Sequence, residues 1–213
     1  MRVQSAAKAA APFSTPRWYP LDLFERAFLL ATLGSFAVRV ATTLALQPIN
    51  ILLLISEALP VILILIRKPG AVSTHGYAWA IAIVGTFTPL LVQPRHPALL
   101  LEPLSAMLMS VGLFTNVAAK LCLNRSFGIV AGNRGVKRTG PYRFIRHPMY
   151  FGYMITHIGF LITHPSSWNI AAYAVTWTAF ILRIRAEETF LLEDPEYRSY
   201  AEQVRYRLIP GLF

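Results

Sequence analysis

Residues 49–66 read INILLLISEALPVILILI, and this stretch determines the class of fold. A transmembrane α-helix needs roughly 17 to 25 mostly apolar residues to cross the hydrocarbon layer, and Glu57 is the one charged residue in the run. Comparable apolar runs follow elsewhere in the chain, at 23–46, 77–93, 98–121, 149–164 and 167–184. The sequence therefore predicts an all-α bundle of about six membrane-spanning helices. Pro60 and Pro89 interrupt two runs, and the last two runs are separated by a short turn, so five spans or a broken hairpin is the alternative.

The composition of the whole chain agrees with a membrane protein. Of its 213 residues, 55% are hydrophobic and only 14% are charged, and the mean hydropathy is +0.49. This apolar excess argues against a soluble globular domain and against disorder, which requires low hydrophobicity. Cys122 is the single cysteine, so a disulfide scaffold is excluded and we interpret the thiol as reduced and inert.

The basic residues predict the orientation in the membrane. The net charge is +10, and Lys and Arg near the ends of spans are retained on the cytoplasmic side. With the N-terminus inside, Arg95 is the one basic residue predicted on the outer side. The sequence thus predicts a multi-pass integral membrane protein with both termini in the cytoplasm. This pattern explains the basic charge without nucleic acid, and it suits contact with anionic lipid headgroups.

The first twenty residues, MRVQSAAKAAAPFSTPRWYP, contain no acidic residue and no apolar core of the length that a secretory signal needs. We interpret residues 1–20 as a cytoplasmic tail. An organellar transit peptide has the same Ala, Ser and basic content and is the alternative.

The one long polar connection is LNRSFGIVAGNRGVKRTGPYRFIRHPMYFGY, residues 123–153. Loops between elements have a median length of about 4 to 6 residues, so a linker alone would be shorter. Four glycines precede Pro141, and glycine allows tight turns and close approach to a ligand. Pro148 suits the first turn of the helix that re-enters the membrane, because no amide donor is lost there. A basic loop that merely obeys the topology rule is the alternative.

The last predicted span leads into RIRAEETFLLEDPEYRSYAEQVRYRLIPGLF, residues 183–213. Arg183 and Glu187 are four residues apart and share one helix face, whereas Arg185 and Glu188 point elsewhere. An ordinary surface ion pair, worth little, is the alternative. Residues 190–204 mix apolar and charged positions in the pattern of an amphipathic helix on the cytoplasmic face.

GPYRFIRHPMYFGY, followed some thirty residues later by RIRAEETFLL and by a terminal IPGLF, resembles the isoprenylcysteine carboxyl methyltransferase family, including its prokaryotic and phospholipid-methylating relatives. The resemblance covers roughly residues 122–213. We therefore divide the chain into a tail at 1–20, a four-span membrane region at 21–121 and a catalytic methyltransferase region at 122–213.

The resemblance implies a membrane-embedded methyltransferase that uses S-adenosylmethionine and releases S-adenosylhomocysteine, with the cofactor in a cytosolic pocket formed by the loop and the C-terminal segment. The family's substrate-binding arginine falls on Arg183. Lys137 stands where relatives more often have an apolar residue, so its contact would be through the backbone. No metal is required. By position, the family's cofactor contacts fall on Val136, Lys137, Tyr142, His147, Pro148, Met149, Tyr150 and Glu187.

The chemistry of the cofactor agrees with several of these positions. Glu187 could bind the amino group, and Arg146 or the amides at the start of the fifth span could bind the carboxylate. Tyr142 or Tyr150 could line the adenine or sulfonium region by stacking or cation–π attraction.

The acceptor is predicted from the same residues. A carboxylate is already ionised at pH 7 and needs only an orienting cation, for which Arg183 is suited. An amine is mostly protonated at pH 7 and would need a base, for which His147 and Glu188 are the nearby candidates. We therefore predict O-methylation of a carboxylate on a lipophilic, isoprenylcysteine-like acceptor in the bilayer. N-methylation of an aminophospholipid headgroup and a non-catalytic scaffold that retains the fold are the alternatives. The expected partners are this acceptor and membrane lipids, without nucleic acid or an obligate protein partner.

Several ionisable side chains lie inside predicted spans, where they suggest function by default. We interpret Arg39 as paired with Glu57 or Glu102 in the bundle, with a substrate role as the alternative. His157 and His164 are interpreted as structural, because a metal site would need more converging ligands than these two.

Overall fold

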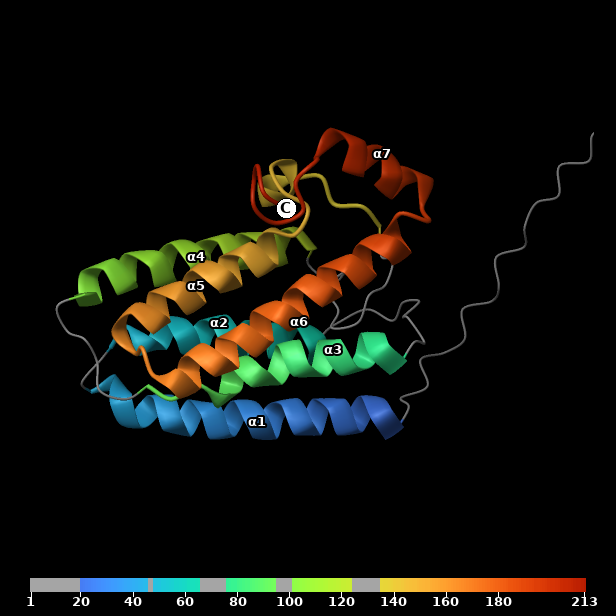
Figure 1. Cartoon of the computed structure of the whole chain (residues 1–213). Helices are drawn as coiled ribbons and strands as arrows, with labels where there is room; N and C mark the ends of the chain where they lie inside the picture. Colours follow the sequence, from blue (N-terminus) through green and yellow to red (C-terminus); the bar gives the residue numbers. More distant parts are fainter. Residues whose placement is uncertain (1–19, 46–47, 66–75, 95–100, 124–134) are drawn as a thin grey trace, which may run out of the picture.

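The computed structural model describes residues 20–45, 48–65, 76–94, 101–123 and 135–213, and the regular elements in these ranges are all helical (Figure 1). The all-α prediction is confirmed for this part of the chain. Residues 1–19 of the predicted tail and 124–134 of the long loop lie outside it. Six helices overlap the predicted spans, although α3 ends before the predicted 93 and α6 extends beyond the predicted 184. They are α1 (Pro20–Leu44), α2 (Asn50–Leu65), α3 (Gly76–Phe87), α4 (Glu102–Leu123), α5 (Pro148–Thr163) and α6 (Ser167–Leu191).

Two helical segments, Ala27–Leu44 and Glu102–Leu123, are long and apolar enough to cross a membrane by themselves. Asn50–Leu63 and Ala80–Leu91 are shorter apolar helical stretches. The outer face of α4 also exposes large apolar side chains, among them Phe114, which is 74% exposed. Contiguous exposed apolar surface of this kind is typical of contact with lipid or another protein.

The prolines act differently in the two runs that they were predicted to interrupt. Helix α2 continues through Pro60, which agrees with the single run predicted at 49–66. Leu53 and Val61 of α2 are both buried in the core, and this packing offsets the hydrogen bond that a proline removes from a helix. Pro89 does end α3, because it lies in the 3-10 helix η1 (Thr88–Leu91) that follows Phe87.

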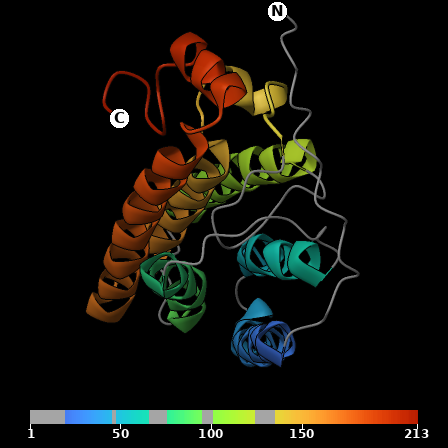
Figure 2. The ribbon, with the colours of Figure 1, turned by 90° about the vertical axis from the view of Figure 1, so that its right-hand side faces the viewer.

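Successive helices run in opposite directions. On α4, the hydroxyl of Ser105 donates to the carbonyl of Gly159 at 2.8 Å, and the amide of Asn116 donates to the carbonyl of Met149 at 3.0 Å, so α4 and α5 are antiparallel. The starts of α1, α3 and α5 and the ends of α2, α4 and α6 therefore lie at one end of the bundle (Figure 1). Figure 2 shows α1 below α2 and α4, with α6 reaching down beside α3.

Helices α4 and α5 touch through their backbones. A Cβ atom added to Gly112 would lie 2.5 Å from the amide nitrogen of Thr156, and one added to Gly152 would lie 2.6 Å from that of Asn116. Only glycine fits at such a distance, and small residues of this kind allow close packing between membrane helices. This contact fixes the start of α5 against the end of α4.

A C-terminal cap, residues 135–147 and 192–213, lies over the ends of α4 and α5 (Figure 1). It contains the 3-10 helix η4 (Gly140–Arg143) and helix α7 (Pro195–Gln203), which begins after Asp194, whose side chain accepts from the amide of Glu196. The predicted helix after the last span is thus present. Tyr197 and Tyr200 of α7 are buried, and the hydroxyl of Tyr200 donates to the carbonyl of Tyr142 at 2.8 Å.

The predicted ion pair of Arg39 is wrong. Its guanidinium donates to the carbonyl of Leu90 in η1 and to the hydroxyl of Ser35, because the 3-10 helix leaves carbonyl groups without partners inside the helix. Glu57 instead faces His157, with 3.7 Å between Oε1 and Nε2. His157 is fully buried and accepts at Nδ1 from the indole of Trp177 at 3.2 Å, which agrees with its structural interpretation.

Candidate functional site

Two consecutive glutamates at the end of α6 organise the site. Helix α6 extends beyond the predicted end of its span at 184 and reaches Leu191, so Glu187 and Glu188 are both helical. Neighbouring residues of a helix differ by about 100° in direction. Glu187 accordingly faces α5, and Glu188 faces the C-terminal cap.

Glu187 joins α6 to α5 through one carboxylate oxygen. Its Oε1 accepts from the hydroxyl of Tyr150 at 2.8 Å and from Nε of Arg183 at 3.1 Å. The Arg183 guanidinium also lies 5.6 Å from the centre of the Tyr150 ring, within cation–π range. Arg183 is only 6% exposed, so the predicted pair on one helix face is confirmed and is not an ordinary surface ion pair.

Glu188 is the centre of a second cluster, which we call the enclosed cluster because its members other than the partly exposed Arg207 are buried. Its Oε1 accepts from Nε2 of His147 at 2.9 Å and from the hydroxyl of Tyr197 at 2.6 Å. Its Oε2 forms an ion pair with Nη2 of Arg146 at 2.8 Å and a longer one with Nε of Arg207 at 3.5 Å. A buried carboxylate needs such partners, because isolated charge is costly to remove from water.

His147 lies between the two clusters. An ionised carboxylate only accepts hydrogen bonds, so Nε2 of His147 carries the proton toward Glu188. The opposite ring atom, Nδ1, lies 3.7 Å from Oε2 of Glu187. The backbone amide of His147 donates to the carbonyl of Arg207 at 2.8 Å, and Pro148 then begins α5 as predicted.

The enclosed cluster changes the acidity of its members. Burial by itself would raise the pKa of Glu188, but the hydrogen bond and charge of His147, together with Tyr197 and Arg146, outweigh burial and lower that pKa to about 2. Burial, followed by the hydrogen bond to Glu188, raises the pKa of Tyr197. Burial and then the charge of Glu187 raise the pKa of Tyr142. Glu188 is therefore ionised at neutral pH, and both phenols are protonated.

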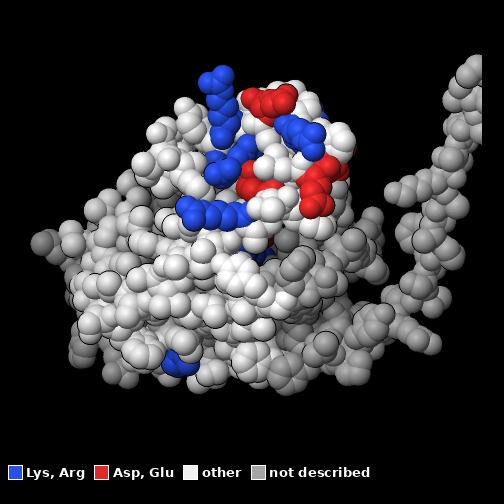
Figure 3. Space-filling model, turned by 45° about the vertical axis from the view of Figure 1, so that its right-hand side comes forward, with Lys and Arg blue, Asp and Glu red and all other residues white. Residues whose placement is uncertain are grey.

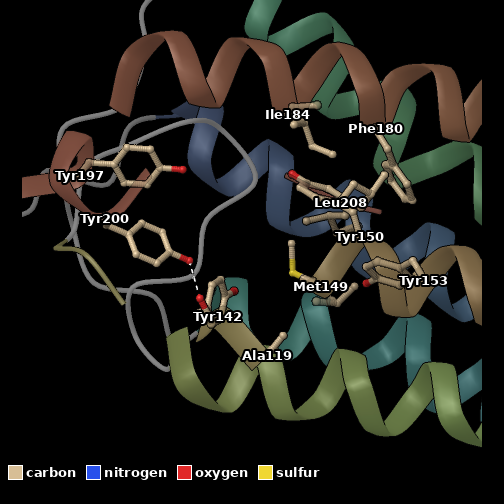
Figure 4. Packing of buried hydrophobic residues seen from close by; sticks show 13 residues of the cluster. Ala119, Tyr142, Met149, Tyr150, Tyr153, Phe180, Ile184, Tyr197, Tyr200 and Leu208 are labelled. Atoms are coloured by element: carbon tan, nitrogen blue, oxygen red, sulfur yellow. Dashed lines mark hydrogen bonds between the residues drawn. The ribbon is translucent and has the colours of Figure 1, made fainter. Parts of the chain in front are cut away.

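The structure brings together some of the positions predicted to bind a cofactor. Tyr142, Met149 and Tyr150 lie in one cluster with residues of α6 and the cap, as Figure 4 shows. Val136 is partly buried against the same cluster, whereas Lys137, at the start of the cap, is partly exposed.

Three residues of the site have contacts that the sequence did not predict. Glu188 was expected on another helix face than Arg183 and Glu187 and was named only as a candidate base for an amine acceptor, and Tyr197 was placed only in the amphipathic pattern at 190–204. Arg146 was a candidate for the cofactor's carboxylate, but it pairs with Glu188 and donates to the carbonyl of Ala201 at 3.2 Å. The consecutive Glu187 and Glu188 beyond the span were the one signal in the sequence that pointed to this second cluster.

The residues present fit the charges of S-adenosylmethionine. Oε1 of Glu187 accepts two hydrogen bonds, and among the described residues Oε2 has only the longer contact from His147. This oxygen can therefore still accept from an ammonium group. The rings of Tyr142 and Tyr150 provide an aromatic surface beside it. The donor set thus combines a carboxylate with the aromatic groups that attract a cation.

Comparison with known proteins finds that part of this site lies in a segment that matches a family model. Residues 101–195 match the family model described as phospholipid methyltransferase. This range begins earlier than the predicted resemblance at 122–213, and it includes α4, α5, α6 and both glutamates.

The chain is also similar to curated methyltransferases. It is 32% identical over 110 residues, 47% of this chain and 46% of the relative, to protein-S-isoprenylcysteine O-methyltransferase of Saccharomyces cerevisiae. It is 34% identical over 103 residues, 44% of this chain and 52% of the relative, to protein-S-isoprenylcysteine O-methyltransferase A of Arabidopsis thaliana. The chain therefore spans about half the length of these relatives. The predicted family resemblance is confirmed.

Proposed function

We propose that the protein is an integral membrane methyltransferase of the isoprenylcysteine carboxyl type, because nearly half of this chain is similar to protein-S-isoprenylcysteine O-methyltransferases. It would use S-adenosylmethionine to esterify a carboxylate on a lipophilic, isoprenylcysteine-like acceptor. The observation that carries this proposal is the contact of the partly buried Glu187 with the buried Arg183 and Tyr150 beside His147, inside the segment that matches the phospholipid methyltransferase model.

The cofactor supplies a methyl group that its sulfonium already activates, so the main task of the chain is alignment. Glu187 would bind the ammonium group through Oε2, and Tyr150 and Tyr142 would line the aromatic side of the pocket. His147 and Pro148 would shape the pocket through the start of α5. Val136, Lys137 and Met149 complete the proposed cofactor contacts.

Arg183 would orient the acceptor. Glu187 fixes its guanidinium through Nε at 3.1 Å, and Tyr150 lies against its face. A carboxylate acceptor is ionised at pH 7, so the chain needs to supply a cation and no base. A guanidinium binds a carboxylate by two parallel hydrogen bonds, which also sets its direction.

The membrane arrangement belongs to the same proposal. Six helices that alternate in direction would cross the bilayer and place the cap and both termini in the cytoplasm, with residues 1–20 as a tail, 21–121 as a membrane region and 122–213 as the catalytic region. Figure 3 supports this arrangement, because charged side chains gather over the cap while the described helix surface beside it is nearly uncharged. A lipophilic acceptor could then reach the site without leaving the bilayer.

Two measurements test this function. Saturable binding of S-adenosylhomocysteine to the folded, detergent-solubilised protein is expected, and its absence would exclude the enzyme and favour a non-catalytic scaffold. The second measurement supplies methyl-labelled S-adenosylmethionine together with native membranes. Label released as methanol by mild base indicates an ester.

One observation favours a second candidate. The family model that matches residues 101–195 is described by phospholipid methylation, so the acceptor could be the amine of an aminophospholipid. An amine must lose a proton before it is methylated. Glu188, the nearest carboxylate to His147, is ionised with a pKa of about 2, so it is a weak base for removing that proton. Label that resists mild base would favour this candidate.

A further inference from the structure

Two exposed arginine–aromatic pairs in the C-terminal cap have no part in the proposed chemistry. Arg143 is followed by Phe144, and Arg205 is followed by Tyr206. All four residues are exposed, and Phe144 reaches 75% exposure. We call these four residues the lipid edge. Each pair thus presents a cation beside an aromatic ring whose removal from water would be favourable.

The two pairs lie on neighbouring segments that the backbone ties together. The amide of Arg146 donates to the carbonyl of Tyr206 at 3.0 Å, and the amide of His147 donates to the carbonyl of Arg207 at 2.8 Å. Ile145, next to the first pair, is only 5% exposed. The lipid edge is therefore anchored to the cap and is not a loose end.

The position of the lipid edge relative to the helices sets its depth. Pro148 begins α5, and a residue spans at most about 3.6 Å of extended chain, so Phe144 lies within about 15 Å of that start. The headgroup layer is roughly 5 to 8 Å thick on each side of the hydrocarbon, and charges act over a Debye length of about 8 Å in physiological salt. The lipid edge is therefore within reach of the headgroups if α5 crosses the bilayer.

The chemistry of the lipid edge matches that environment. Aromatic side chains are enriched at the membrane interface, and a guanidinium binds phosphate through its planar fork. We propose that Arg143, Phe144, Arg205 and Tyr206 bind the anionic phospholipid headgroups of the membrane in which the helices lie. This inference rests on the proposed membrane function and adds a lipid preference to it.

Other arginines of the cap are engaged within the chain and provide a matched control. Arg138 approaches the side chain of Glu196 at 3.9 Å and donates to its carbonyl, and Arg198 donates to the carbonyl of Leu192 at 3.1 Å. Within the described residues the structure gives no such partner for Arg143 or Arg205.

Spin labels at single cysteines test the depth of the lipid edge. The background is Cys122→Ser, because Cys122 is the one native cysteine. Phe144 is replaced by a labelled cysteine in one variant, and Ser199, which is exposed on α7, is replaced in a control variant. A third variant carries the label at Phe114 on the outer face of α4 and provides a reference in the hydrocarbon. Each full-length variant is placed in nanodiscs of phosphatidylcholine alone or with added phosphatidylglycerol, and collisions with oxygen and with a water-soluble nickel reagent are compared.

The ratio of the collision rate with oxygen to that with nickel is expected to be at least about threefold higher for the label at 144 than for the label at 199. This ratio should rise further at 144 when phosphatidylglycerol is added, because the label then lies deeper in the membrane. A label at 144 that behaves as the one at 199, while the label at 114 lies in lipid, would overturn the lipid edge and leave the membrane function standing. A water-exposed label at 114 would contradict the membrane function itself. Neither result depends on methyl transfer.

Charge removal tests the lipid preference. Arg143→Gln with Arg205→Gln is compared with Arg138→Gln and Arg198→Gln, which removes the same charge from the same cap. Cations near a membrane surface each contribute measurably to binding of anionic lipid, so the first double variant is expected to retain at least about tenfold less phosphatidylglycerol, relative to phosphatidylcholine, in native mass spectrometry. Equal losses in the two double variants would overturn the assignment to these residues.

Discussion

His147 and Glu188 connect the start of α5 to the end of α6, with 2.9 Å between Nε2 and Oε1. Both side chains are buried, at 6% and 2% exposure. The same imidazole presents Nδ1 toward Glu187 at 3.7 Å. The enclosed cluster around Glu188 therefore orients the ring that borders the proposed cofactor site.

Glu188→Gln should destabilise the folded protein by about 3 to 5 kcal/mol, because Arg146 would keep a buried charge without its carboxylate. The measurement is unfolding in detergent. Glu193→Gln is the control, since Glu193 is exposed on the same cap. Equal stability of the two variants would show that the Glu188 cluster does not hold the cap.

Acid should weaken the folded state through the same carboxylate. The pKa of Glu188 is about 2 in the folded protein, below its usual value of 4.5, so its stabilising contribution is complete above about pH 4.5 and is lost as the pH falls toward 2. We expect the melting temperature to fall over this range, and the fall to be smaller in Glu188→Gln. An identical pH profile in the parent and in Glu188→Gln would contradict the assignment.

Glu187→Ala should weaken binding of S-adenosylhomocysteine by roughly ten- to hundredfold while the protein stays folded, because a hydrogen bond to a charged group contributes about 1.5 to 3 kcal/mol. Isothermal titration of detergent-solubilised protein measures the affinity. Glu196→Ala on the outer surface of α7 provides the control. Unchanged affinity would remove Glu187 from the cofactor site.

Arg183→Lys should separate orientation of the acceptor from membrane topology. Lysine keeps the positive charge but loses the planar fork, so insertion and S-adenosylhomocysteine binding should persist while kcat falls at least about tenfold, equivalent to roughly 1.4 kcal/mol. Turnover near that of the parent would argue for a topological role and against a carboxylate acceptor.

Pro148→Ala should raise the KM for S-adenosylmethionine more than it lowers thermal stability. Pro148 fixes the backbone where α5 begins, next to the His147 ring. Steady-state kinetics and a melting curve on the same preparation give both quantities. A loss of stability with unchanged KM would show that Pro148 serves only to start the helix that re-enters the membrane and does not shape the cofactor site.

The sequence predicted the helices better than it predicted the contacts between them. Long apolar runs locate α1 to α6 because helix formation in this chain follows local hydrophobicity. The proline at 148 marks a helix start for a local reason as well. Pro60 left a broken span open as an alternative, because the burial of Leu53 and Val61 on either side of it is a tertiary property that local hydrophobicity does not indicate.

The candidate site shows the same division. The spacing of Arg183 and Glu187 predicts their contact, since four residues make one helix turn. The partners of Glu188 come from α7 and from the segment before α5, and no local periodicity indicates which distant segment will cover a helix end. Arg39 was misassigned for the same reason, because its acceptor is a backbone carbonyl of Leu90.

The backbone bonds between 146–147 and 206–207 also have a consequence for biosynthesis. Tyr206 and Arg207 follow Arg146 and His147 by about sixty residues along the chain, so the amides of Arg146 and His147 have no such acceptors until this later segment has been synthesised. The backbone around the His147 imidazole is therefore fixed only after the segment at 206–207 has folded back onto the start of α5.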